Sequence, residues 1–460
     1  MRALGPCLFG FLALANLGRA GGEPSQAPAP DPEIARIVSD ISAERIQRSV
    51  YVLASFKTRH TLSDPLPSGD GIGGALTWVR AEFGRASAES GGRLRVDLDT
   101  FEQPASPPRI PQPLSISNVV ATLPGTGAEA SGRTLVISGH YDSRATNPLD
   151  STGAAPGADD DASGVAAVLE LARVMSHYKF SANLVFLAVA GQEQALNGST
   201  HWARQARARG VDIEAMLDND IIGSSRSESG HVDRGTVRLF AEGVRPVPNP
   251  SDEQIALLKA GGENDTPPRE LARAVREIAA AYVPSLKVRV IYRADRYLRG
   301  GDHLPFLEEG YPAVRFTEPA EDFRRQHQDL REEKGVVYGD TPDHVDFAYV
   351  ADVARVNGAA LAVLARAPAP PRGVQVEAAR LENDTTLRWN PSPEPDLGGY
   401  RIVWRETTSP FWEHALDVAP GVTRTTVEGV SKDNVVFGVE AFDTAGHASP
   451  AVFPSARRTL

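Results

Sequence analysis

Residues 135–144 read Leu135-Val-Ile-Ser-Gly-His140-Tyr-Asp142-Ser-Arg144, an apolar strand that runs directly into a histidine and an aspartate. Residues 184–190 form a second apolar run, LVFLAVA, without alternation, as expected of a strand buried on both faces. Between the two, residues 164–177 place apolar side chains at helical spacing. This order predicts an α/β domain with a mostly parallel central sheet covered by helices on both faces.

The same alternation extends in both directions along the chain. Helices are predicted over residues 32–56, 72–85, 200–209, 269–282 and 347–365. Strands are predicted over residues 94–101, 117–123, 134–139, 215–222, 287–292 and 313–317. Residues 223–268 are polar and rich in Gly and Pro, so we expect a long loop that borders a substrate site.

The pattern of the sequence changes after residue 366. Residues 367–372 form a proline-rich connector between an α/β domain over 32–366 and a second domain over 373–460. Short strand candidates separated by turn signals predict an all-β, immunoglobulin-like sandwich there. Its expected core aromatics are Trp389, Tyr400 and Phe437. By this pattern the segment resembles a fibronectin type III domain.

The N-terminus predicts export. Residues 1–20 contain a basic start, an apolar stretch from Leu8 to Leu17 and a small residue, Ala20, at the expected cleavage site, as in a signal peptide. Residues 21–31 predict a flexible linker. Cys7 lies at the start of this apolar region, directly before Leu8, which argues against a lipoprotein anchor. We expect a secreted or periplasmic protein without a transmembrane segment.

Composition excludes several classes of function. The 460 residues carry a formal net charge of -11, which argues against nucleic-acid binding through a basic face. The chain has 1 cysteine, so a disulfide framework and cysteine-ligated metals are excluded. Any metal chemistry must therefore use histidine and carboxylate ligands.

Such residues collect where predicted strands end, which is where open α/β sheets bind ligands. Each of these segments taken alone is also compatible with an ordinary solvated turn. The segments are His140-Tyr-Asp142, Asp159-Asp160-Asp161 before a helix, Gln192-Glu193, Asp218-Asn-Asp220, Asp302-His303 and Gln326-His327-Gln-Asp329.

In this order, the motifs resemble peptidase family M28, over about residues 35–365 and most specifically over 135–223. The resemblance implies a three-layer zinc-peptidase fold and two zinc ions that share a bridging carboxylate, with one histidine and one acid completing each site. It also implies that Asp142 supports the first histidine ligand. The zinc ligands that it implies are His140, Asp160 (bridging), Glu193, Asp220 and His327.

The fifth ligand rests on the weakest match. The family's usual His-Thr-x-x-Asp string is missing, and His327 is chosen for its place after Phe316-Thr317-Glu318-Pro319. His303 and His344 stay open as alternatives.

The sequence departs from the family at Gln192, where a glutamate normally serves as general base. Glutamine cannot take a proton usefully at neutral pH, and loss of a general base typically costs ~10²–10⁴-fold in rate. Three readings stay open: a slow enzyme, a different base among Asp302, Asp159 and Asp161, or a pseudoenzyme that keeps its metals.

The resemblance implies an exported, zinc-dependent exopeptidase of aminopeptidase type that acts on peptide or protein N-termini. The alternatives are a catalytically impaired peptide-binding protein and a glutaminyl-cyclase-like enzyme. The C-terminal domain could contact a surface or a glycan. Arg59 and Arg299 are expected to be solvated, although either could recognise a substrate carboxylate.

Overall fold

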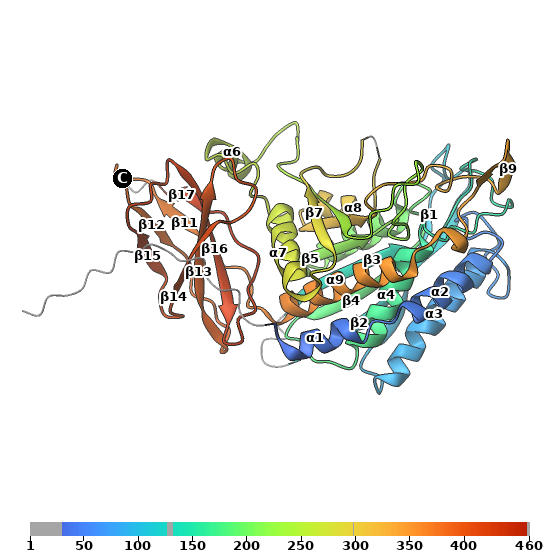
Figure 1. Ribbon diagram of the computed structural model, residues 1–460, viewed down its shortest axis with the longest axis horizontal. Coiled ribbons are helices and arrows are strands. Elements are labelled where there is room, and N and C mark those ends of the chain that lie inside the picture. Colours follow the sequence, from blue (N-terminus) through green and yellow to red (C-terminus); the bar gives the residue numbers. More distant parts are fainter. Residues whose placement is uncertain (1–29, 127–131, 298, 458–460) are drawn as a thin grey trace, which may run out of the picture.

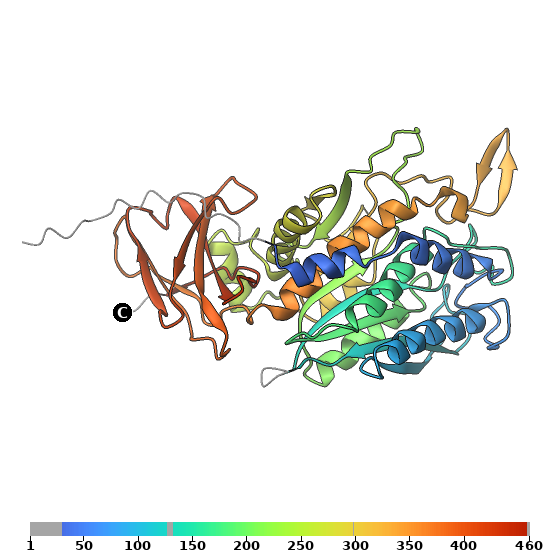
Figure 2. The ribbon, with the colours of Figure 1, turned by 60° about the horizontal axis from the view of Figure 1, so that its bottom comes forward.

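The structure is a computed structural model that describes residues 30–126, 132–297 and 299–457 (Figure 1). The expected signal peptide and most of the linker lie outside these residues. Figures 1 and 2 show a larger part, in which helices surround a sheet, and a smaller part made of strands at the C-terminal end. The predicted α/β class of the larger part is confirmed.

An eight-stranded sheet with the order β1-β2-β4-β3-β5-β8-β6-β7 forms the centre of the larger part. Its strands are β1 (Arg95–Gln103), β2 (Leu114–Leu123), β3 (Arg133–His140), β4 (Asn183–Val189), β5 (Asp212–Asn219), β6 (Thr236–Ala241), β7 (Lys287–Ile291) and β8 (Ala313–Thr317). The inner strands β4, β3, β5 and β8 are parallel.

The sheet as a whole is mixed, which corrects the expectation of a mostly parallel sheet. β1 and β2 pair antiparallel, and so do β2 and β4. β6 runs antiparallel to β8. No helix separates β1 from β2, so these two strands form a hairpin, whereas parallel neighbours need a crossover such as the helix between β3 and β4. β6 lies in the segment that we expected to be a loop.

Helices cover both faces of the sheet. One face carries the larger apolar cluster, formed with α1, α2, α3, α4, α7 and α9, and the other packs against α5 and α8. The helices are α1 (Pro32–Ser39), α2 (Ala43–Ser55), α3 (Ile72–Glu89), α4 (Ala162–Met175), α5 (Asn197–Ala208), α6 (Asp252–Lys259), α7 (Pro267–Tyr282), α8 (His303–Glu308) and α9 (Phe347–Arg366).

The helical pattern predicted over residues 32–56 is divided into α1 and α2. Asp31 caps α1 by accepting from the backbone N–H of Glu33, with Pro32 as the first helical residue. Ser42 caps α2 by accepting from the N–H of Arg45. The apolar spacing continues across the break, which explains why periodicity alone merged the two helices.

Among the described residues, α9 is the one helix long and apolar enough to cross a membrane, with a mean hydropathy of 1.4. In the structure, 78% of the apolar window is buried, and the helix packs against α1, α2, α4 and α7. Its hydropathy is therefore explained by its place in the core.

The C-terminal part contains a four-stranded sheet, β15-β12-β11-β17, and a three-stranded sheet, β14-β13-β16. Its strands are β11 (Gln375–Glu377), β12 (Thr385–Arg388), β13 (Leu397–Glu406), β14 (His414–Val418), β15 (Arg424–Val427), β16 (Val435–Asp443) and β17 (Ser455–Arg457). Trp389, Tyr400 and Phe437 are all buried in one cluster between them, which confirms the predicted aromatic core.

Buried charges join the two parts. Arg273 of α7 and Arg405 of β13 both donate to Asp265, at 3.1 and 2.6 Å, and Arg273 also donates to the carbonyl of Pro410. Both arginines are almost fully buried. Moving the C-terminal part away from α7 would leave these buried charges without partners, which is unfavourable. The contact therefore holds the C-terminal part against α7.

We expect Glu440→Gln to stabilise the protein selectively at high pH. Burial raises the pKa of Glu440, on β16 near α7, to about 8, and the Glu277 carboxylate adds to the shift. In the unfolded chain the same carboxyl ionises near ~4.3, so the unfolding free energy of wild type falls as pH rises from there to about 8.

Glutamine at position 440 does not ionise, so the variant lacks this dependence of stability on pH. Urea unfolding should therefore give a variant-minus-wild-type difference near zero at pH 4 and about 1–3 kcal/mol in favour of the variant at pH 9. A difference that does not change with pH would contradict this origin.

Candidate metal centre

The five expected ligands come together at the carboxyl edge of the central strands. His140 is the last residue of β3, Glu193 lies in the turn after β4, and Asp220 directly follows β5. Asp160 precedes α4, and His327 lies in the long segment between β8 and the hairpin strands β9 (Arg331–Glu333) and β10 (Val336–Tyr338). Parallel strands place their carboxyl ends at one edge, so residues far apart in sequence become neighbours.

The five residues form two groups that share Asp160. In one group, ligand atoms of His140, Asp160 and Asp220 lie within 4.8 Å of one another; in the other, those of Asp160, Glu193 and His327 do. The two oxygens of Asp160 face different histidines, at 3.2 Å from His140 Nε2 and 2.9 Å from His327 Nε2. Each group offers one histidine and one further carboxylate, as the family resemblance implies.

Several of these atoms are buried without a hydrogen-bond partner. They are His140 Nε2, Asp160 Oδ2 and Glu193 Oε1. Asp160 Oδ2 and Glu193 Oε1 both lie 2.9 Å from His327 Nε2, but neither contact is aligned as a hydrogen bond. Unpartnered buried polar atoms are rare in proteins. Three of them converging on one place fit a bound cation.

The carboxylates are held in their charged form. Burial alone would raise the pKa of Asp160, but His327 and His140 outweigh it and hold the pKa well below its usual range. Burial also acts on Asp220, and Arg315 and His140 lower its pKa. Both groups therefore supply negative charge at neutral pH.

Asp142 orients His140, mainly through its backbone. His140 Nδ1 lies 3.1 Å from the Asp142 carbonyl oxygen and 3.5 Å from its carboxylate. The carboxylate instead accepts from the backbone N–H groups of Gln192 and Glu193 and from the Thr61 hydroxyl. The expected support is present, but the closer partner is the carbonyl.

Asp161 and Asp340 hold the loop that carries Asp160. Asp161 is fully buried, caps α4 through the N–H of Gly164 and also accepts from His140 and Ile221. Asp340 accepts from the N–H groups of Asp159 and Asp160, both at 2.8 Å. Sequence reasoning missed Asp340, whose surroundings carry no local signal.

Arg59 is fully buried, which corrects the expectation that it is solvated. It donates to four backbone carbonyls, those of Leu53, Tyr141, Pro156 and Gly157. Burial lowers the pKa of Arg59 to about 10, which leaves it charged at neutral pH. Its role is to bind the end of α2 to the segments around His140 and Asp160, and it is not available to a substrate.

Two further arginines touch the ligands, and sequence reasoning missed both. Arg315, in the middle of β8, lies 2.9 Å from Asp220 Oδ1. Its charge within the buried strand AVRFT was a usable signal. Arg144 lies 2.8 Å from Glu193 Oε2, and its Nη2 is 2.6 Å from His327 Nδ1.

The state of the His327 ring follows from these contacts. Burial lowers the pKa of His327, whereas the carboxylates of Glu193 and Asp160 raise it, to about 9. A protonated Nδ1 would meet the Arg144 guanidinium donor to donor at 2.6 Å. We therefore assign the metal-free ring as neutral, with its hydrogen on Nε2.

His303 and His344, the alternatives for the fifth ligand, do not join the centre. Both ring nitrogens of the fully buried His303 are occupied, by Asp218 Oδ2 at 3.3 Å and the Ala294 carbonyl at 2.7 Å. His303 is therefore the wrong alternative for the fifth ligand. His344 lies at the cavity described below but in neither metal-ligand group.

The profile of peptidase family M28 matches residues 118–355, from β2 into α9. The chain belongs to peptidase family M28. A probable zinc metalloprotease of Pyrenophora teres f. teres (strain 0-1) is 46% identical over 426 residues, which cover 92% of this chain and 87% of that protein. The predicted class of enzyme, a hydrolase of the metallopeptidase type, is thereby confirmed.

Two solved structures show the same fold with different activities. The aminopeptidase from Aneurinibacillus sp. strain AM-1 has a TM-score of 0.50 at 15% identity, covering 72% of this chain and 96% of its own. A glutaminyl cyclase from Macrostomum lignano has a TM-score of 0.50 at 16% identity, covering 74% and 94%. At such identities the likeness shows the fold alone, so the reaction must be argued from the site.

Gln192 of this M28 domain lies beside the first group. Its side chain is half-buried, and Nε2 donates to Asp220 Oδ2 at 3.3 Å. The proposed substitutes for a base differ in access: Asp161 and Asp302 are fully buried, whereas Asp159 lines a cavity. Burial raises the pKa of Asp159 to about 6, and the Gly223 N–H donates to its carboxylate.

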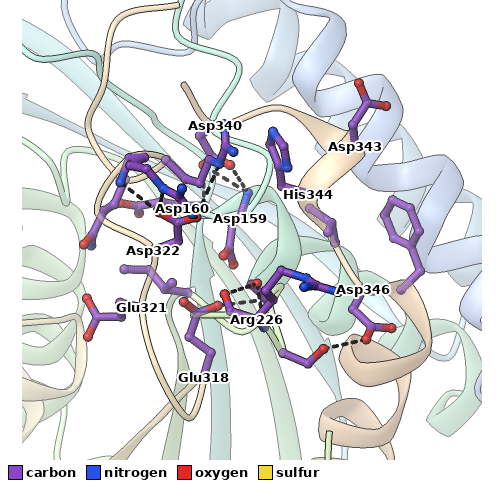
Figure 3. Close-up of a pocket in the computed structure, with 18 of the residues that line it drawn as sticks. Asp159, Asp160, Arg226, Glu318, Glu321, Asp322, Asp340, Asp343, His344 and Asp346 are labelled. Carbon is purple, nitrogen blue, oxygen red and sulfur yellow. Dashed lines mark hydrogen bonds and ion pairs between the residues drawn. The ribbon is translucent and has the colours of Figure 1, made fainter. Parts of the chain in front are cut away.

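A cavity of about 460 Å³ opens beside Asp160 (Figure 3). Figure 3 shows Asp159, Asp160 and Asp340 on one side of it and Glu318 across from them. Eight carboxylates line the cavity against four arginines. Arg299 is not among the lining residues and bonds Gln326 and Glu321 instead.

We expect Arg59→Met to destabilise the metal-free protein by about 3–5 kcal/mol, because four buried carbonyls lose their donor. Arg299→Met is the matched control, since the Arg299 side chain is 39% exposed, and should change stability by less than about 0.5 kcal/mol. Urea unfolding in the presence of a chelator measures both. Equal effects of the two substitutions would contradict the bracing role of Arg59.

Proposed function

We propose that the chain is an exported, zinc-dependent exopeptidase of aminopeptidase type that removes N-terminal residues from peptides and proteins. The observation that carries the proposal is the pair of histidine–carboxylate groups that share Asp160. The name of the Pyrenophora relative, probable zinc metalloprotease, supports zinc as the metal.

Two zinc ions are the proposed cofactor. His140, Asp160 and Asp220 would hold one, and Asp160, Glu193 and His327 the other. Imidazole and carboxylate are ordinary zinc ligands, and the chain has no cysteine in the described residues to compete with them. Bound zinc supplies a water of lowered pKa and polarises the carbonyl of the scissile bond.

The cavity supports action at an N-terminus. Its volume of about 460 Å³ is that of a pocket for a small ligand and would hold about one or two residues of a peptide. Burial raises the pKa of Glu318 and Asp340 well above the usual range, but the other carboxylates in the lining still outnumber its arginines, and this excess attracts the free ammonium group of a peptide. An internal peptide bond offers no such charge.

Gln192 can accept a hydrogen bond at the centre, but it cannot act as a general base. The backbone N–H of Gln192 donates to the Asp142 carboxylate, and its side-chain amide donates to Asp220. These two bonds hold the side-chain carbonyl oxygen of Gln192 beside the centre, where it can accept a hydrogen bond. An amide cannot take the proton of the attacking water. Asp302 and Asp161 are too buried to replace it, and the Asp159 carboxylate accepts from the Gly223 N–H at 2.6 Å and from the Ser163 hydroxyl at 3.4 Å. We therefore infer slow turnover.

Export and the C-terminal part complete the proposal. The apolar segment in residues 1–20 supports a signal peptide and a secreted or periplasmic location. Seven strands in two sheets around one aromatic core support a fibronectin type III-like assignment. A surface or glycan partner for this domain stays a prediction.

We expect wild type to bind zinc and to release amino-acid anilides slowly, and Gln192→Glu to raise kcat by ~10²–10⁴-fold by restoring a proton acceptor. Gln326→Glu is the control, because it adds a carboxylate at the cavity beside Asp160 without replacing the amide beside Asp220. Zinc content and anilide release measure both variants.

The outcomes separate the alternatives. Bound zinc without release in wild type or Gln192→Glu would indicate a peptide-binding pseudoenzyme. Cyclisation of a glutaminyl peptide in place of anilide release would indicate a glutaminyl-cyclase-like enzyme. Absence of both zinc and turnover would overturn the proposed function.

Removal of zinc should lower the melting temperature, because a ligand at ~100 times its Kd stabilises the folded state by ~2.7 kcal/mol. Asp160→Asn should abolish this response to a chelator, since Asp160 belongs to both groups. Asp343→Asn, an exposed carboxylate at the same cavity, should keep it. Thermal unfolding with and without chelator decides; an unchanged response in Asp160→Asn would contradict the bridging role.

A further inference from the structure

The two histidines of the centre have opposite neighbours at Nδ1. His140 Nδ1 faces acceptors, the Asp142 carbonyl at 3.1 Å and the Asp142 carboxylate at 3.5 Å. His327 Nδ1 faces a donor, Nη2 of Arg144, at 2.6 Å.

This difference decides which nitrogen can bind a metal. An imidazole that gives its Nε2 lone pair to a metal carries its hydrogen on Nδ1 and normally donates it to a carboxylate or carbonyl. His140 meets that condition. His327 does not, because a guanidinium has donors only, so Nδ1 must accept and the hydrogen must lie on Nε2.

Arg144 also adds charge to the same group. Its Nε donates to Glu193 Oε2 at 2.8 Å, and the two side chains are only 14% and 5% exposed. A buried guanidinium against two of the three ligands repels a dication with little screening by salt. Arg315 touches the other group at Asp220 and makes no contact with its histidine, so it leaves His140 free to bind.

We propose that Arg144 makes the two halves of the centre unequal. The His140–Asp160–Asp220 half binds zinc first and tightly. The Asp160–Glu193–His327 half binds it weakly, and only when Arg144 has left His327. Arg144 is thus a positioning residue that acts through His327 and Glu193. The inference rests on the proposed metal centre.

Titration calorimetry of zinc into the metal-free full chain tests the inference, with the visible absorption of bound cobalt as an independent readout. Wild type should show two steps whose dissociation constants differ at least ~10-fold. Arg144→Met should tighten the second step by ~10–100-fold, because it removes both the donor and the charge. Arg144→Lys keeps a charged donor and should keep the difference between the two dissociation constants.

Arg109→Met is the matched control. Arg109 donates to the backbone carbonyl of Glu193 at 3.3 Å and to no ligand atom of the centre, so its removal should leave both steps unchanged. His140→Ala should abolish the tight step and His327→Ala the weak one. These two variants identify the halves even if Arg144→Met folds poorly.

Each other result has a definite meaning. A second step that weakens in Arg144→Met would show that Arg144 only orders its neighbours and would overturn the inference. Two equal steps in wild type would also overturn it while leaving the proposed function intact. No zinc binding in wild type would overturn the proposed function itself.

Discussion

Buried carboxylates that repel one another govern the architecture around the metal centre. Ligand atoms of Asp160 lie within 4.8 Å of those of Asp220 on one side and of Glu193 on the other, and all three residues are almost fully buried. Isolated charges in such a place cost several kcal/mol each, so they persist only where positive charge or a cation balances them. Arg315 and Arg144 supply part of that balance.

Backbone N–H groups around the centre also stabilise buried carboxylates. Asp161 and Asp340 accept from five backbone N–H groups between them, which fixes the loop of Asp160 at the start of α4. Ile221 has a φ of 63°, unfavourable for a β-branched residue, and turns the chain directly after Asp220. Its carbonyl accepts from Glu318 and Thr317, so tertiary contacts hold the strained turn.

Local patterns predicted much of this fold and missed what depends on distant partners. Residues 313–317 and 347–365 closely match β8 and α9, because the first follows a turn signal and the second repeats apolar residues at helical spacing. β6 was missed because it is short and lies in a polar segment rich in Gly and Pro. Three of the five ligands, His140, Glu193 and Asp220, follow strand ends, which is a local signal. Arg144 meets His327 across 183 residues, a contact that no local pattern encodes.

Gln192 and Arg144 change the charge of the centre in the same direction. A glutamate at 192 would add one negative charge beside Asp220, and Arg144 adds one positive charge beside Glu193. The three ligand carboxylates and the two arginines that touch them leave one net negative charge. One zinc ion turns this into one net positive charge, and a second ion adds two more in a buried site. Charge balance therefore favours tight binding of the first ion, in the half in which His140 is already oriented, over binding of the second.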